Sequence, residues 1–142
     1  MIVLVVIIAL EEGLMGNIIF STSMLIMTVQ FFFISYRLTG INRVMLNIPI
    51  SIFESCIPLV QERDEPIIYF DKEKLNTELT SYFEKSIKKY TDEYELDYYY
   101  YSQDDHSICT SEYCTAIEIT IEAKITLTMN YQKTVHFYIQ KN

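Results

Sequence analysis

The chain has 142 residues, half of them hydrophobic, and a formal net charge of −8 at pH 7. This length allows one small folded domain together with an anchor. The acidic balance argues against binding to nucleic acid and against docking onto anionic lipid headgroups, because both need basic patches.

The segment from Leu14 to Tyr36 contains no Lys, Arg, Asp, Glu or His. About twenty apolar residues in a helix span the roughly 30 Å hydrocarbon core of a bilayer, so this segment is predicted to be a transmembrane helix. Its Ser and Thr hydroxyls can hydrogen-bond back to helix carbonyls and therefore cost little in lipid. A buried core helix is the alternative, which is disfavoured because the rest of so short a chain could not easily enclose it.

An apolar run, Met1 to Leu10, precedes the acidic pair Glu11 and Glu12. The run lacks the basic start of a secretory signal peptide and is too short to span a membrane alone. Either the helix runs from Met1 to Tyr36 with the two carboxylates partway along it, or the recorded start is internal to a longer reading frame. Glu11 and Glu12 are candidate intramembrane or interfacial carboxylates, as flanking charges or as groups that contact a partner.

Apolar residues spaced by three and four continue the helix beyond Arg37, and Pro49 is expected to end it. Cys56 is expected to be a small buried side chain, and Gln61–Pro66 is interpreted as a charged linker. The predicted organisation is an anchor helix with its extension at 1–43, a connector at 44–70 and a small α+β domain at 71–142.

An amphipathic helix is predicted from Asp71 to Tyr90. The Asp71 carboxylate can cap the free N–H groups of the first turn. Apolar side chains recur at steps of three and four, which places them on one helix face: Leu75, Leu79, Tyr82, Phe83, Ile87 and Tyr90.

Three strands are predicted after this helix. Tyr94–Ser102 is rich in aromatic residues, which favour strands, and alternate rings are expected to fill the core. Apolar and polar residues alternate over Cys114–Met129, which predicts a long strand with one buried face. A turn at Asn130–Gln132 then leads to a last strand, Val135–Ile139, with His136 on its polar face. Short connections favour an antiparallel meander. The predicted fold class is therefore α+β, with an N-terminal transmembrane helix followed by one amphipathic helix packed on a three-stranded antiparallel meander.

Cys109 and Cys114 are candidates for a disulfide that would fix the loop leading into the long strand. A metal site formed with Asp104, Asp105 and His106 is the competing interpretation. Structural zinc usually takes paired ligands from two knuckles, and the sequence offers one such set. Two free thiols are the third possibility.

Catalysis is not expected, because no histidine is placed to activate a nucleophile. Glu118 and Glu122 share a strand face about 13 Å apart, which is too far for a glycosidase pair. We therefore expect no enzymatic activity, no cofactor, no small-molecule substrate and no nucleic acid partner. The expected partners are membrane lipid and other membrane proteins.

The orientation signals conflict. Arg37 and Arg43 follow the predicted membrane helix and favour a cytoplasmic domain under the positive-inside rule. The acidic domain with paired cysteines favours the other side, where disulfides persist. We favour an extracytoplasmic domain.

This layout resembles bacterial pilin-like proteins and, more loosely, the TadE-like pilus-assembly proteins. The residues that carry the resemblance are Glu11 or Glu12, the helix Leu14–Tyr36 and its continuation with Arg37 and Arg43. The resemblance implies a structural or assembly role at the cell envelope, in a pilus or a type II/IV secretion-like system, with pilus-assembly proteins as partners. The alternative is a membrane-tethered, cytoplasm-facing binding or sensing module.

Overall fold

A computed structural model of the chain describes residues 2–58, 60–62, 65–102, 107–109 and 113–139. Side chains are described from Gly13 onward, with those of residues 60–67 excepted. The chain divides into two compact units, Met1–Tyr36 and Arg37–Asn142.

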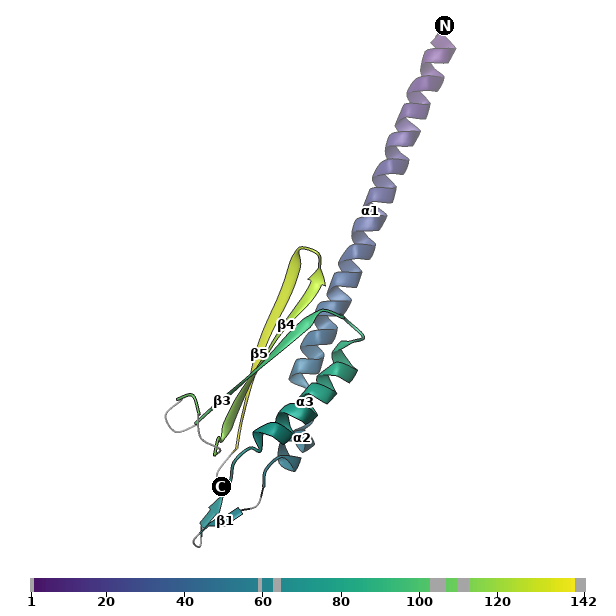
Figure 1. The fold of residues 1–142 in the computed structure, drawn as a ribbon. Helices are drawn as coiled ribbons and strands as arrows, with labels where there is room; N and C mark the ends of the chain where they lie inside the picture. The colour runs from purple at the N-terminus through teal and green to yellow at the C-terminus, as the bar shows by residue number, and fades with distance from the viewer. Residues whose placement is uncertain (1, 59, 63–64, 103–106, 110–112, 140–142) are drawn as a thin grey trace. The chain divides into compact units, whose positions relative to one another are not determined.

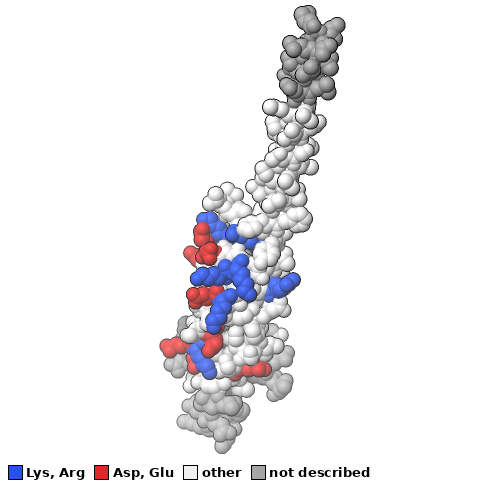
Figure 2. Space-filling view, turned by 90° about the vertical axis from the view of Figure 1, so that its right-hand side faces the viewer, with Lys and Arg blue, Asp and Glu red and all other residues white. Residues whose placement is uncertain are grey.

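Helix α1 runs from Ile2 to Leu46 and supplies the secondary structure of the first unit. Its described part contains a stretch long and apolar enough to cross a membrane, with a mean hydropathy of 1.9. Figure 2 shows no charged side chain on the described residues of this unit. Thr22 and Thr28 donate their hydroxyls to the carbonyls of Ile18 and Met24, at 2.8 and 2.7 Å. A long apolar helix at the predicted position is therefore confirmed, as is the backbone bonding of two of its hydroxyls.

The second unit contains a three-stranded antiparallel sheet (Figure 1). Its strands are β3 (Tyr94–Tyr101), β4 (Ala116–Thr126) and β5 (Met129–Tyr138), and β4 lies in the centre. The predicted α+β class and the antiparallel meander are confirmed. The buried face of β4 carries a row of isoleucines that are almost completely excluded from solvent: Ile117, Ile119, Ile121 and Ile125.

Helix α3 (Lys72–Ile87) lies on one side of this sheet (Figure 1). The Asp71 carboxylate accepts a hydrogen bond from the Lys74 N–H at 3.1 Å, so the predicted cap is confirmed. Four apolar side chains of the predicted stripe are fully buried: Leu75, Leu79, Phe83 and Ile87. Their burial together with the isoleucines of β4 forms the centre of the core.

Residues before Asp71 also contribute to this core. Ile41 and Met45, in the last turns of α1, are fully buried. In the short helix α2 (Ile50–Ser55), the Phe53 ring stacks on Phe137 of β5 with centroids 4.2 Å apart. The Tyr82 hydroxyl of α3 lies 3.1 Å from the Val44 carbonyl and 3.2 Å from the Asn47 carbonyl. It donates to orphan carbonyls at the end of α1.

The interpretation of Gln61–Pro66 as a linker is wrong in one respect. Strands β1 (Val60–Glu62) and β2 (Glu65–Ile67) pair as a short antiparallel ladder. Charged composition does not prevent such pairing, because the ladder is made by backbone groups and Pro66 needs no donor at an edge position.

The predicted turn at Asn130–Gln132 is also wrong. The chain reverses at Leu127–Thr128, where Thr126 pairs with Met129, and the expected turn residues lie inside β5. Leu127 and Met129 continue the apolar alternation of β4, and for this reason the pattern did not reveal the turn. Both side chains are exposed instead of buried.

Candidate functional site

The structure joins Cys109 and Cys114 in a disulfide, with their Cα atoms 5.8 Å apart. Cys109 donates its backbone N–H to the Tyr100 carbonyl, and the Cys114 carbonyl accepts from Phe70, both at 2.9 Å. The bridge therefore ties the segment after β3 to the start of β4. The predicted disulfide is confirmed.

The competing metal site loses its two sulfur ligands, because disulfide-bonded cysteines are not thiolates. Asp104, Asp105 and His106 lie outside the described residues. Within the described part of the chain, no group of three His, Cys, Asp or Glu side chains is placed to hold a metal ion.

Glu11 and Glu12 lie within α1, but their side chains lie outside the described part of the chain. Their role as intramembrane or interfacial carboxylates stays a prediction.

The face of the β3–β4–β5 sheet that points away from α3 is called the outer face. One half of this outer face is aromatic. Tyr99, Tyr101, Ile108, Glu118 and His136 line a depression open to solvent. His136 is exposed, as predicted, and its Nδ1 lies 3.5 Å from a Glu118 carboxylate oxygen. An exposed imidazole beside a carboxylate, set among aromatic side chains, is a composition typical of binding surfaces.

The alternate tyrosines of β3 point to the other face, as predicted. The Tyr100 hydroxyl donates to the Asn76 side-chain oxygen at 2.7 Å, and the Tyr98 hydroxyl hydrogen-bonds with Thr80 Oγ1 at 3.2 Å. Burial raises the pKa of the Tyr100 hydroxyl far above its ordinary value and also raises the pKa of Tyr98. Both hydroxyls therefore stay neutral and hold α3 on the sheet.

The other half of the outer face is acidic. Glu95 of β3 lies directly opposite Glu122 of β4, and Asp97 lies opposite Thr120. Like charges placed opposite each other across two strands are destabilising. Glu93 is neutralised by Lys124, whose Nζ lies 2.7 Å from its carboxylate. This half of the face is therefore acidic.

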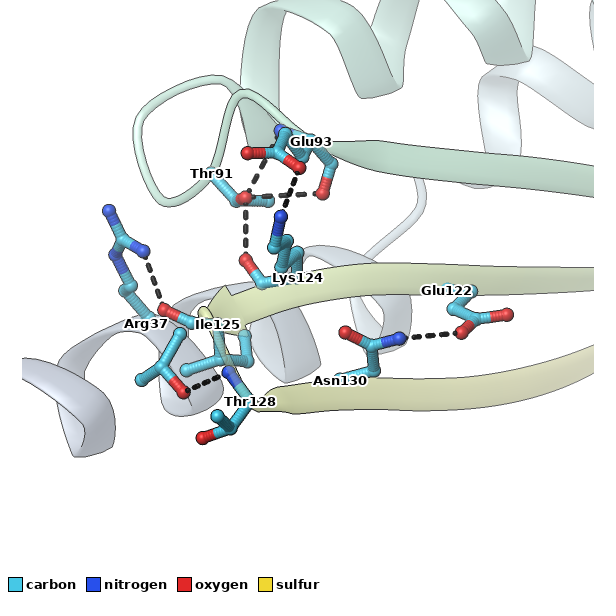
Figure 3. Close-up of polar contacts among 9 residues, drawn as sticks. Arg37, Thr91, Glu93, Glu122, Lys124, Ile125, Thr128 and Asn130 are labelled. Atoms are coloured by element: carbon cyan, nitrogen blue, oxygen red, sulfur yellow. Dashed lines mark hydrogen bonds and ion pairs between the residues drawn. The ribbon is translucent and has the colours of Figure 1, made fainter.

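Side chains from three separate segments meet at the β4–β5 turn (Figure 3). Arg37 of α1 donates to the Ile125 carbonyl at 2.6 Å. The Thr91 hydroxyl, from the loop between α3 and β3, donates to the Lys124 carbonyl at 2.8 Å. Sequence reasoning placed Arg37 beside the membrane but did not find this contact, because nothing in the sequence pairs residues 88 positions apart.

Comparison with known proteins adds no relative. No protein-family model matches the chain, and neither a curated protein nor a solved structure matches it. A functional proposal therefore depends on the apolar helix, the disulfide and the surfaces of the α+β domain.

Proposed function

We propose that this is a single-pass, membrane-anchored envelope protein whose α+β domain lies outside the cytoplasm and has a structural or assembly role. One observation carries the proposal. The uninterrupted helix α1 supplies both the apolar, uncharged segment and two fully buried residues of the domain core, Ile41 and Met45. An anchor that is also a core element suits a protein that fixes a domain at a membrane surface.

The extracytoplasmic placement is supported by the disulfide. A bridge between Cys109 and Cys114 forms and persists in oxidising compartments and is rare in the cytosol. Arg37 and Arg43 support the opposite orientation, in which the protein is a membrane-tethered binding or sensing module facing the cytoplasm. We give the disulfide more weight because two arginines are a small charge bias.

The assembly role is supported by the outer face of the sheet. Tyr99 and Tyr138 expose 53% and 54% of their surface on it, and large aromatic side chains are enriched in protein interfaces. The same face carries the acidic half described above. We propose that this face contacts other membrane or pilus-assembly proteins, in a pilus or a type II/IV secretion-like system.

Membrane fractionation tests the anchor, and thiol trapping tests the orientation. Cells are lysed in denaturant with an alkylating reagent, and the membrane-fraction protein is analysed by mass spectrometry. We expect Cys56 to be alkylated and Cys109 and Cys114 to remain bonded to each other. Cys56 is the internal control, since it is the free cysteine of the chain and denaturation exposes it. Alkylation of all three residues would contradict the extracytoplasmic placement.

Site-specific photo-crosslinking tests the assembly role. A photoreactive residue at Tyr99 is expected to form adducts with a second copy or with another envelope protein. The matched control is Leu46, which is similarly exposed but lies at the end of α1, away from the outer sheet face. Equal crosslinking at both positions would argue against an interface on the sheet.

A further inference from the structure

We infer that the turn between β4 and β5 inserts its apolar side chains into the surface of the lipid bilayer, beside the point where α1 leaves the membrane. This inference rests on the proposed anchor and adds a second membrane contact, made by the domain itself.

The turn has the composition of a membrane contact. Leu127 exposes 92% of its surface, more than any other large hydrophobic residue in the described part of the chain, and Met129 exposes 37%. The stretch Thr126–Met129 carries no charge. Two-residue hairpin turns usually hold Gly, Asn or Asp, which suit the backbone and the solvent. An exposed leucine at the tip of a turn is better suited to an apolar environment than to water.

The location of the turn is set by Arg37. Arg37 is the first charged residue after the uncharged segment Leu14–Tyr36, so in a membrane it marks the boundary between hydrocarbon and water. Its guanidinium donates to the Ile125 carbonyl at 2.6 Å. The β4–β5 register shifts between Lys124 and Thr126, and the Ile125 carbonyl at this shift accepts from Arg37.

Leu127 lies within reach of that boundary. It follows Ile125 by two residues, and an extended chain advances about 3.3 Å per residue. Its backbone is therefore within about 7 Å of the carbonyl that Arg37 holds. Apolar side chains of interfacial segments sit about 5–10 Å into the boundary between headgroups and acyl chains, a depth that a leucine at this position can reach.

The contact is apolar and not electrostatic. The side chains around the turn offer no excess of positive charge, since Lys124 pairs with Glu93 and the Glu122 carboxylate, which accepts from Asn130 at 3.0 Å, is opposite in sign to Arg37 (Figure 3). The net charge of −8 also disfavours attraction to anionic lipid. The turn should therefore enter a bilayer of zwitterionic lipid as readily as one that contains anionic lipid.

Fluorescence of an environment-sensitive probe tests the insertion. The full chain, with Cys56→Ala and the disulfide intact, carries a single nitrobenzoxadiazole probe on Leu127→Cys and is reconstituted into phosphatidylcholine vesicles. We expect emission shifted to shorter wavelength and quenched by nitroxide-labelled lipid, unchanged when anionic lipid is added. The matched control is Ile108→Cys, an exposed apolar position whose bridge to Tyr101 places it at the other end of the sheet. This probe should show aqueous emission.

A probe on Phe32→Cys separates this inference from the proposed anchor. Quenching by lipid at Phe32 together with aqueous emission at Leu127 would overturn the insertion and leave the anchor standing. Aqueous emission at both positions would overturn the anchor as well. In a second series the probe is on Met129→Cys: Leu127→Asp should shift its emission to the aqueous wavelength, whereas Leu127→Met should not. Equal emission from these two variants would also overturn the insertion.

Discussion

Gly40 of α1 gives a sharp test of how the last turns of this helix pack. A Cβ atom at Gly40 would overlap the ring of Tyr90, which follows α3 in the chain. Alanine is a better helix former than glycine by about 1 kcal/mol, so Gly40→Ala would stabilise the helix if no side chain lay against this position. Overpacking against a ring costs about 1–3 kcal/mol. We therefore expect Gly40→Ala to lower the free energy of unfolding of the domain by about 1 kcal/mol, as the difference of these terms.

The sign of this effect should reverse when the ring is removed. In a Tyr90→Ala background the overlap is absent, and Gly40→Ala should stabilise the domain by about 1 kcal/mol, through helix propensity alone. The coupling between the two positions is then about 2 kcal/mol, within the range found for residues in direct contact.

The measurement is a double-mutant cycle on the full chain in detergent. Denaturant unfolding of the domain is followed by near-ultraviolet circular dichroism of its tyrosines. Gly16→Ala is the control, because a Cβ there meets no atom within 4 Å, and it should leave the domain transition unchanged. A Gly40→Ala protein as stable as the wild type, or a cycle without coupling, would refute the packing of Tyr90 against α1.

Three further predictions concern single contacts. Tyr100→Phe removes the donor to Asn76 and should lower the free energy of unfolding by about 1 kcal/mol, whereas the exposed Tyr99→Phe should change it little. Because the folded-state pKa of Tyr100 is raised, its contribution is complete below the unfolded pKa of about 10 and is lost as pH rises through the folded pKa. An unfolding series against pH should therefore show a weaker alkaline decline in Tyr100→Phe, and an identical decline would contradict the assignment. Replacing both Cys109 and Cys114 with Ser should lower the free energy of unfolding by about 2 kcal/mol, and equal stability of the oxidised and reduced wild type would count against a structural role. Tyr82→Phe should cost about 1 kcal/mol by leaving carbonyls at the end of α1 without this donor, measured as a lower denaturant midpoint with unchanged membrane fractionation.

Helix α3 and the sheet were predictable from sequence because their patterns are local. The steps of three and four from Leu75 to Ile87 and the alternation in β4 each report one buried face. The disulfide stayed one of three alternatives, because spacing along the chain does not give the distance between two Cα atoms. The contact between Arg37 and Ile125 has no sequence signal, since it depends on how the meander places the β4–β5 turn beside α1.

The error at Leu127–Thr128 has a physical cause that bears on function. The prediction of a strand from alternating residues assumes that each apolar side chain of the pattern is buried in the core. Leu127 breaks this premise, since it is apolar and almost fully exposed. Places where local rules fail are commonly functional sites, and this one supports the inferred membrane contact.

The two parts of α1 also differ in whether their apolar side chains are exposed or buried. From Leu14 to Tyr36 the helix is apolar on every side, which suits lipid as the solvent. After Tyr36 one side of the helix is buried, with Ile41 and Met45 excluded from solvent and Arg43 exposed, which is the pattern that a protein core requires. In the proposed membrane arrangement the helix leaves the lipid at Arg37, the residue that also donates to the Ile125 carbonyl beside the β4–β5 turn. With the proposed insertion of Leu127 at this same boundary, the anchor and the turn would be two contacts with one membrane surface.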